Sequence, residues 1–207
     1  MPDGRSPSQS AKQNEALSFE NARVGPQTAL VFENRDGKII DEWINGDDHQ
    51  AYAEVALLCY WLDEKIVSTP KPVRVAQVYQ DYEDQPGEKI SDIVLVRPNL
   101  QQAEPVAAMI SRAVALTSVK HVRIVADTAN HVVFTRLGLL LANCPLHSIH
   151  LSARLIDHDR QPIPETFRGA VIHQLPRDPW MPEIVRRRAF GSGPKPDHTP
   201  SVNRQFH

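Results

Sequence analysis

Apolar runs between residues 27 and 175 are separated by polar turn segments, and the spacing within each run predicts a strand or a helix. The first run, residues 27–44, holds two β-type stretches on either side of Asp36-Gly37. This dipeptide favours a tight turn, so we expect a hairpin there. The next run, residues 45–66, places apolar side chains at helical spacing and predicts a helix.

Downstream of residue 73 the predicted elements follow the order strand, strand, helix, strand, helix, strand. The strands are short apolar runs bounded by turn residues, and the first of these helices has Pro105 where a first helical turn tolerates it. Strands that alternate with helices form parallel units joined by right-handed crossovers. The pattern therefore predicts an α/β fold, a single three-layer domain with a mixed, mainly parallel sheet.

The two ends of the chain differ in composition from the part between them. Residues 1–26 are rich in Ser, Gln, Asn and charge, and such a segment cannot bury enough apolar surface to offset its ordering entropy, so we expect a disordered arm. Residues 176–207 contain six prolines, which remove backbone donors too often for a regular element, and we expect a second arm. The folded domain is thus expected to span residues 27–175.

Composition narrows the possible surroundings and partners of the chain. A hydrophobic fraction of 41% supports a real core, and a net charge of -2 leaves no global basic field that would attract nucleic acid. Cys59 and Cys144 lie in apolar runs, as buried free thiols do, which favours a reducing compartment. Because we find neither a secretory signal nor an apolar run of about 20 residues, we expect a cytoplasmic protein without a membrane span.

Four acidic residues are candidates for catalysis. Asp127 follows a predicted inner strand, Glu33 and Asp36 follow the first strand, and Asp92 lies near the third. Carboxylates from different strands that converge on a Mg²⁺ or Mn²⁺ ion support hydrolysis of phosphodiesters. We otherwise expect no cofactor.

A second interpretation of Asp127 needs no chemistry. Thr128 or Asn130 would cap the following helix, and Asp127 would complement the helix dipole. We favour this interpretation. Separately, the sequence carries no G-x-S-x-G elbow and no glycine-rich phosphate loop, which excludes P-loop nucleotide hydrolysis and gives nucleophilic catalysis little support.

The strings "TALVFENRDG", "VRVAQVYQDY", "KISDIVLVRPN" and "HVRIVADTANHVVFTRL" together resemble the element order of NYN and PIN-like nuclease domains, over about residues 28–152. By position, Glu33 with Asn34 matches the first acidic site of that family, and Asp127 matches the later one. The resemblance implies metal-dependent cleavage of single-stranded nucleic acid.

The acidic site departs from the pattern of that family at three places. Glu33 stands where Asp is usual, Asn130 stands where a second acid of the later loop is usual, and Arg97-Pro98 lies where another acid is expected. A domain with these departures is expected to bind rather than to cut.

The string "PWMPEIVRRRAF" is the candidate binding element of the C-terminal arm. Aromatic and arginine side chains dominate protein interfaces, and arginine also binds phosphates. We expect this element to dock on a protein partner, with nucleic acid as the alternative for the arginines. The function expected first is an accessory or assembly protein, non-catalytic, that engages a larger complex through this arm; the alternative is a divergent PIN/NYN-like nuclease. The candidate binding residues are Trp180, Met181, Ile184, Arg186, Arg187 and Arg188.

Overall fold

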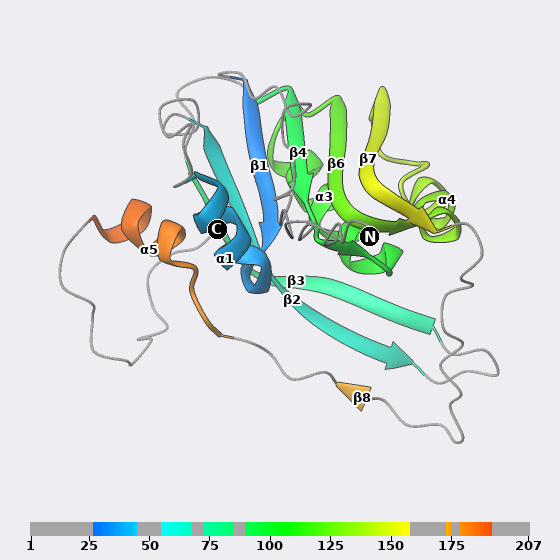
Figure 1. Ribbon diagram of the computed structural model, residues 1–207, viewed down its shortest axis with the longest axis horizontal. Helices are drawn as coiled ribbons and strands as arrows, with labels where there is room; N and C mark the ends of the chain where they lie inside the picture. The colour runs from blue at the N-terminus through cyan, green and yellow to red at the C-terminus, as the bar shows by residue number, and fades with distance from the viewer. Residues whose placement is uncertain are drawn as a thin grey trace, which may run out of the picture.

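The computed structural model of the chain is shown in Figure 1. It describes residues 27–44, 55–67, 73–84, 90–157, 173–174 and 179–191. The arm predicted for residues 1–26, most of the C-terminal arm and residues 45–54 of the predicted helix lie outside the described residues.

The described strands form one sheet with β1 (Thr28–Glu33) near its middle. The order is β3-β2-β1-β4-β6, with β7 beside β6 on the far edge and β5 continuing the line of β4 along the end of β6. Every pairing among β1, β2, β4, β6 and β7 is parallel, whereas β3 and β8 pair with β2 in antiparallel fashion. The remaining strands are β2 (Ala56–Val67), β3 (Val73–Glu83), β4 (Asp92–Val96), β5 (Asn99–Leu100), β6 (His121–Asn130), β7 (Ser148–Asp157) and β8 (His173–Gln174).

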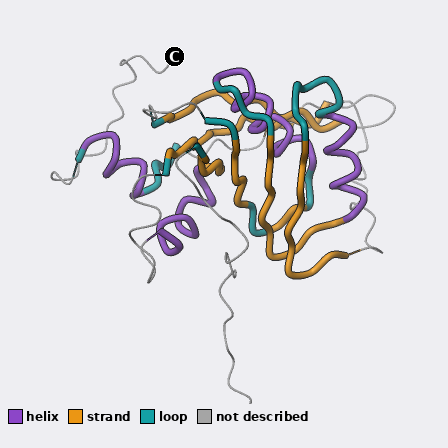
Figure 2. The backbone as a smooth tube through the Cα atoms, turned by 90° about the horizontal axis from the view of Figure 1, so that it is seen from above, coloured by secondary structure: helices purple, strands orange, loops and turns teal. Residues whose placement is uncertain are grey.

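Helices cover both faces of the sheet, so the predicted three-layer α/β fold with a mixed, mainly parallel sheet is confirmed (Figure 2). On one face, α3 (Ala103–Leu116) and α4 (His131–Leu140) pack on the inner strands and form the first core. On the other face, α1 (Gly37–Ile44) and α5 (Glu183–Phe190) contribute to the second core. No helix among the described residues is long and apolar enough to cross a bilayer.

The predicted N-terminal hairpin is wrong. After β1 the chain makes one 3-10 turn, η2 (Asn34–Asp36), and continues directly into α1. Ile40 is buried in the second core while Lys38 and Glu42 are exposed. In a strand these three side chains would share one face, so this pattern of burial needs a helix.

The predicted helix of residues 45–66 is wrong for residues 56–66, because residues 56–67 form the strand β2. Every side chain from Val55 to Leu62 is buried, and the two cores on either side of the sheet take alternate residues of this run. An uninterrupted apolar run fits a helical period and a strand period equally well, and here the strand is covered on both faces.

The predicted elements between residues 92 and 157 are confirmed. Two strands and two helices alternate as expected before β7, and Pro105 lies in the first turn of α3. The side chain of Asn130 caps α4 by accepting hydrogen bonds from the backbone N–H groups of Val132 and Val133, at 2.9 and 3.3 Å. Thr128 is not the cap, because its hydroxyl donates to Asn99 Oδ1 instead.

The expectation that residues 176–207 hold no regular element is wrong for part of the segment. α5 is an eight-residue helix that begins directly after Pro182. Its Ile184 and Val185 are buried in the second core. Burial of these side chains holds the segment against the domain despite its prolines.

Candidate functional site

The carboxyl ends of β1 and β4 form the point where the chain reverses its direction of winding. From β1 the chain passes through α1 on one face to β2, and from β4 it passes through α3 on the opposite face to β6. In open α/β sheets, ligands bind in the crevice outside such a switch point. The side chains at these two strand ends are therefore the first candidates for function.

Six charged side chains meet at this switch point, and we call them the charged cluster: Glu33, Arg35, Asp36, Glu64, Arg74 and Arg97. Glu33 is the last residue of β1, Asp36 closes the 3-10 turn, and Arg97 directly follows β4. The backbone thus brings Glu33, Asp36 and Arg97 together from neighbouring strand ends.

Arg97 lies between the two carboxylates that end β1. Its Nη1 contacts Glu33 Oε2 and lies 3.1 Å from Asp36 Oδ2. Glu33 is completely buried, with an exposed fraction of 0%. A buried carboxylate needs a charged or hydrogen-bonding partner, and Arg97 supplies one.

The rest of the charged cluster extends along β2. Arg35 contacts Glu33 and donates from Nη2 to Glu64 Oε1 at 2.9 Å. Arg74 of β3 donates from Nη1 to Glu64 Oε2 and to Gln102 Oε1, each at 2.8 Å. The cluster contains three carboxylates and three guanidinium groups, so it has no excess negative charge when all six are ionised.

Burial sets the protonation of Asp36. Desolvation raises the pKa of this carboxyl to about 6, although the positive charge of Arg97 lowers it in part. Burial acts to lower the pKa of Arg97, but the nearby carboxylates of Asp36 and Glu33 raise it overall. Arg97 therefore stays positively charged between the two acids.

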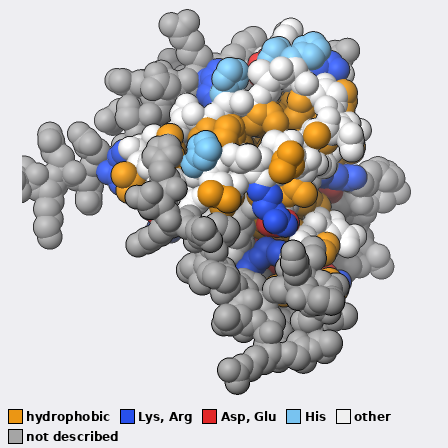
Figure 3. All heavy atoms as spheres, turned by 90° about the vertical axis from the view of Figure 1, so that its right-hand side faces the viewer, with side chains coloured by type: hydrophobic (Ala, Val, Ile, Leu, Met, Phe, Trp, Pro, Cys, Tyr) orange, Lys and Arg blue, Asp and Glu red, His pale blue; other side chains and the backbone are white. Residues whose placement is uncertain are grey.

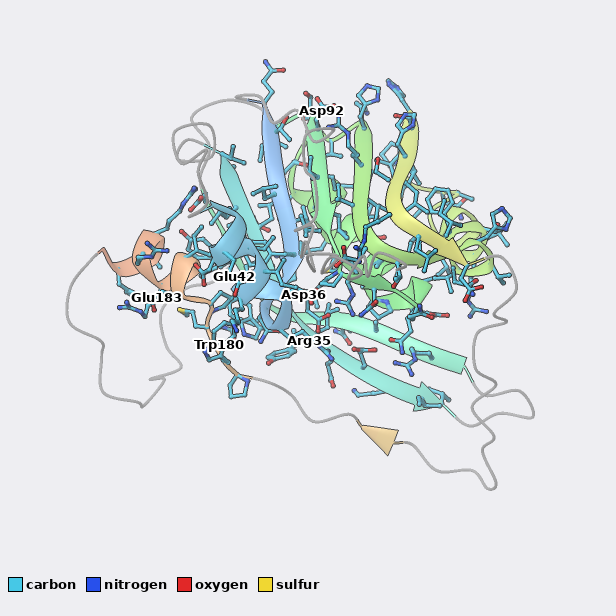
Figure 4. The ribbon with its side chains drawn as sticks, viewed as in Figure 1. Arg35, Asp36, Glu42, Asp92, Trp180 and Glu183 are labelled. Atoms are coloured by element: carbon cyan, nitrogen blue, oxygen red, sulfur yellow. The ribbon has the colours of Figure 1, made fainter. Side chains whose placement is uncertain are left out.

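The structure does not gather the four predicted catalytic acids. Glu33 and Asp36 lie together, but Asp92 begins β4 and pairs in register with Thr28, at the opposite end of the sheet (Figure 4). Asp127 lies within β6, three residues before its end, and its Oδ1 is 3.8 Å from Arg154 Nε. Among the described residues, no three His, Cys, Asp or Glu side chains are grouped as a metal site would need.

The predicted binding residues of the C-terminal arm contact the chain itself. The carbonyl oxygen of Trp180 accepts hydrogen bonds from Asn34 Nδ2 at 3.1 Å and from Trp61 Nε1 at 3.0 Å. Met181 packs against the second core, and Ile184 is buried in it. These contacts place the segment beside the residues that follow β1.

The three predicted arginines also have partners within the chain. Arg186 pairs with Glu183, Arg187 lies 3.4 Å from Asp41 of α1, and Arg188 contacts Asp84. Arg188 also donates to the carbonyl oxygen of Val55 at 2.6 Å. Each of these three arginines is thus paired with a carboxylate of the chain itself.

Sequence reasoning missed three members of the charged cluster: Arg35, Glu64 and Arg74. Glu64 lies in the segment assigned to a helix, so its position in β2, beyond the carboxyl end of β1, was not foreseen. The mixed parallel and antiparallel pairing of β2 with β1 and β3 brings Glu64 near both Arg35 and Arg74. A strand assignment for residues 56–67 would have suggested this cluster.

Comparisons with known proteins show a partial likeness. No family model and no curated protein matches the chain. A solved structure titled "Structure of AQ2163 protein from Aquifex aeolicus" is similar over 64% of this chain, with a TM-score of 0.45 and 15% sequence identity. The chain spans 55% of the length of that protein.

Proposed function

We propose that the chain is a non-catalytic accessory or assembly protein. The carboxylates at its switch point are neutralised by an arginine of the same chain. The observation that carries this proposal is the position of Arg97, whose guanidinium contacts Glu33 and Asp36 at once. A catalytic divalent cation requires carboxylate oxygens that converge on an open position. Arg97 places a fixed positive charge beside the two carboxylates that would supply them.

The resemblance to PIN and NYN domains fits this proposal. Arg97 stands where that pattern leads us to expect another acid, and Asp127 lies beside Arg154 rather than in the charged cluster. We infer a domain of PIN-like ancestry that keeps the strand-end acids as structural ion pairs. Such a domain would bind and assemble without cutting.

The outer side of the docked C-terminal segment is the proposed contact for a protein partner. Trp180 and Phe190 are 45% and 60% exposed, whereas Ile184 and Val185 face the core. Exposed aromatic side chains on a backbone that is fixed by its own contacts are the type of residue that anchors interfaces. Because Arg187 and Arg188 already pair with acids, we favour a protein partner over nucleic acid.

A metal-dependent nuclease is the second candidate. The observation in its favour is that Glu33 and Asp36 meet at the switch point, where α/β domains bind ligands. Mg²⁺ or Mn²⁺ would bind there after Arg97 moved aside.

A cleavage assay separates the two candidates. We expect no Mg²⁺- or Mn²⁺-dependent cleavage of single-stranded RNA or DNA by the full chain. Cleavage that is lost in Asp36→Asn and kept in Asp92→Asn would instead support the nuclease, because Asp92 lies at the other end of the sheet. Asp92→Asn is thus the matched control.

The partner contact has its own test. Crosslinked complexes recovered with the full chain should be lost with Trp180→Ala and Phe190→Ala, and kept with Leu116→Ala, an exposed apolar residue of α3. The Trp180→Ala change removes only the side chain. The backbone carbonyl of residue 180, which accepts from Asn34 and Trp61, remains. Recovery that is unchanged in all variants would contradict a partner site on this segment.

A further inference from the structure

Exposed apolar side chains are concentrated on α4 and β7. Of the nine large hydrophobic residues that are strongly exposed among the described residues, five belong to these two elements. Figure 3 views the side of the molecule that carries them and shows hydrophobic side chains gathered there, with polar groups around them. Apolar patches with a polar rim mark interaction sites. The five residues are Val132, Leu139, Leu140, Leu155 and Ile156, of which Ile156 lies on the opposite face of the sheet from Leu155.

β7 is also an edge strand. Its ten residues pair with β6 on one side, and no described strand pairs with the other side. Proteins usually protect such edges with proline, lysine or a short strand. The sequence of β7, SIHLSARLID, contains neither proline nor lysine, and its charged residues, Arg154 and Asp157, lie near its C-terminal end.

The charges around this surface are balanced within the chain. Arg154 of β7 lies 3.8 Å from Asp127, and Arg136 of α4 lies 2.6 Å from Glu104 of α3. The surface therefore offers no excess charge that would select a strongly acidic or basic partner. Two copies of it would not repel each other.

We propose that a second copy of this chain binds the surface by pairing its own β7 with β7 in antiparallel fashion. A two-fold axis perpendicular to the sheet relates the two strands, so each copy extends the sheet of the other, and in the register given below the described residues that pair are 153–157 of each β7. This axis preserves the faces of the sheet. Leu155 lies on the α4 face, since it continues the alternation of Ile149, Leu151 and Ala153.

The pairing has a preferred register. A register centred on Arg154 would place two arginines directly opposite each other, which destabilises a strand pair. A register centred on Leu155 instead places the two Leu155 side chains together and sets each Arg154 opposite an Ile156. The joined sheet then carries both α4 helices on the same face, one on either side of the contact.

The molar mass of the full chain in solution tests this proposal. Light scattering should give twice 23.3 kDa for the wild type and 23.3 kDa for Leu155→Lys, which would oppose two lysines in the contact. Val75→Lys is the matched control, because Val75 is also exposed, at 44%, but lies on β3 at the opposite edge of the sheet. This control should remain a dimer.

Several results would overturn the proposal: a monomeric wild type at every concentration, a dimer that survives Leu155→Lys, or a dimer that Val75→Lys dissociates. A second measurement needs no variant. Amide hydrogen exchange in β7 of the wild type should become faster on dilution while exchange in β1 stays constant, and equal dilution dependence in both strands would contradict the proposal. The mass test is independent of the partner test, which uses Trp180 and Phe190.

Discussion

Replacing Asp36 by asparagine tests the electrostatics of the charged cluster. Asparagine keeps the shape of the side chain and removes its negative charge, and Arg97 retains its contact with Glu33. Burial raises the pKa of Asp36 from 3.8 to about 6, so the folded protein prefers the neutral carboxyl more strongly than the unfolded chain does. We therefore expect Asp36→Asn to stabilise the protein at neutral and alkaline pH.

The magnitude and its pH window follow from linkage. A pKa that rises from 3.8 to about 6 corresponds to a free energy of about 3 kcal/mol at a pH above both values. In the wild type this destabilisation is complete above the folded-state pKa and disappears as the pH falls below 3.8, where both states bind the proton. The gain in Asp36→Asn should be largest near pH 8 and close to zero below pH 4.

Urea unfolding of both proteins at several pH values measures this difference. Glu42→Gln is the matched control, because Glu42 lies on the exposed side of α1 and its change should stay within about 0.5 kcal/mol. A loss of stability in Asp36→Asn at pH 8 would contradict the claim that the buried Asp36 carboxylate destabilises the folded protein. It would mean that the ion pair with Arg97 outweighs the cost of burying the carboxylate.

Two further predictions concern packing and capping. In Gly37→Ala, the new Cβ would lie 2.4 Å from Pro182 Cβ and Cγ, so we expect a loss of about 1–3 kcal/mol and faster amide exchange in α5; unchanged exchange would show that the segment tolerates the methyl group. Asn130→Ala should cost about 1 kcal/mol in thermal or urea unfolding because it removes the cap of α4, and Asn130→Ser should recover most of this, whereas equal stability of all three proteins would contradict the capping role.

The second half of the domain could be predicted because its signals are local. β4, α3, β6, α4 and β7 have short apolar runs, a well-placed proline and an asparagine cap, and each signal acts within a few residues. In the first half, the local sequence does not distinguish a helix from a strand, and only the packing of the domain decides between them. The run from Val55 to Leu62 is apolar throughout, so its period was ambiguous, and the turn-favouring dipeptide Asp36-Gly37 argued against α1.

The C-terminal segment shows a different limit of sequence reasoning. Its prolines lower the local tendency to form structure, but contacts with residues far away in the chain hold the segment: Arg187 of α5 lies near Asp41, and Trp61 donates to the carbonyl oxygen of Trp180. The periodicity of a segment carries no information about such contacts. The same residues that looked like anchors for a partner therefore proved to contact the domain itself.

The acidic site was predictable in part. The position of Glu33 and Asp36 after the first strand follows from the local sequence. Asp92 is the first residue of its strand, and since parallel strands share one carboxyl end, its place at the opposite end of the sheet could have been inferred once β4 was accepted as parallel. The pairing of Arg97 with both acids depends on which strand lies beside β1, which no local pattern determines.

A calorimetric titration of Mn²⁺ into the full chain, wild type and Arg97→Met, tests most directly whether Arg97 takes the place of a cation at this site. We predict no specific heat of binding for the wild type. If Arg97→Met remains folded, any binding that appears there should require Asp36. If the wild type binds Mn²⁺ specifically and Asp36→Asn abolishes this binding, Arg97 does not take the place of a cation. The carboxylates would then hold a metal ion despite the guanidinium beside them.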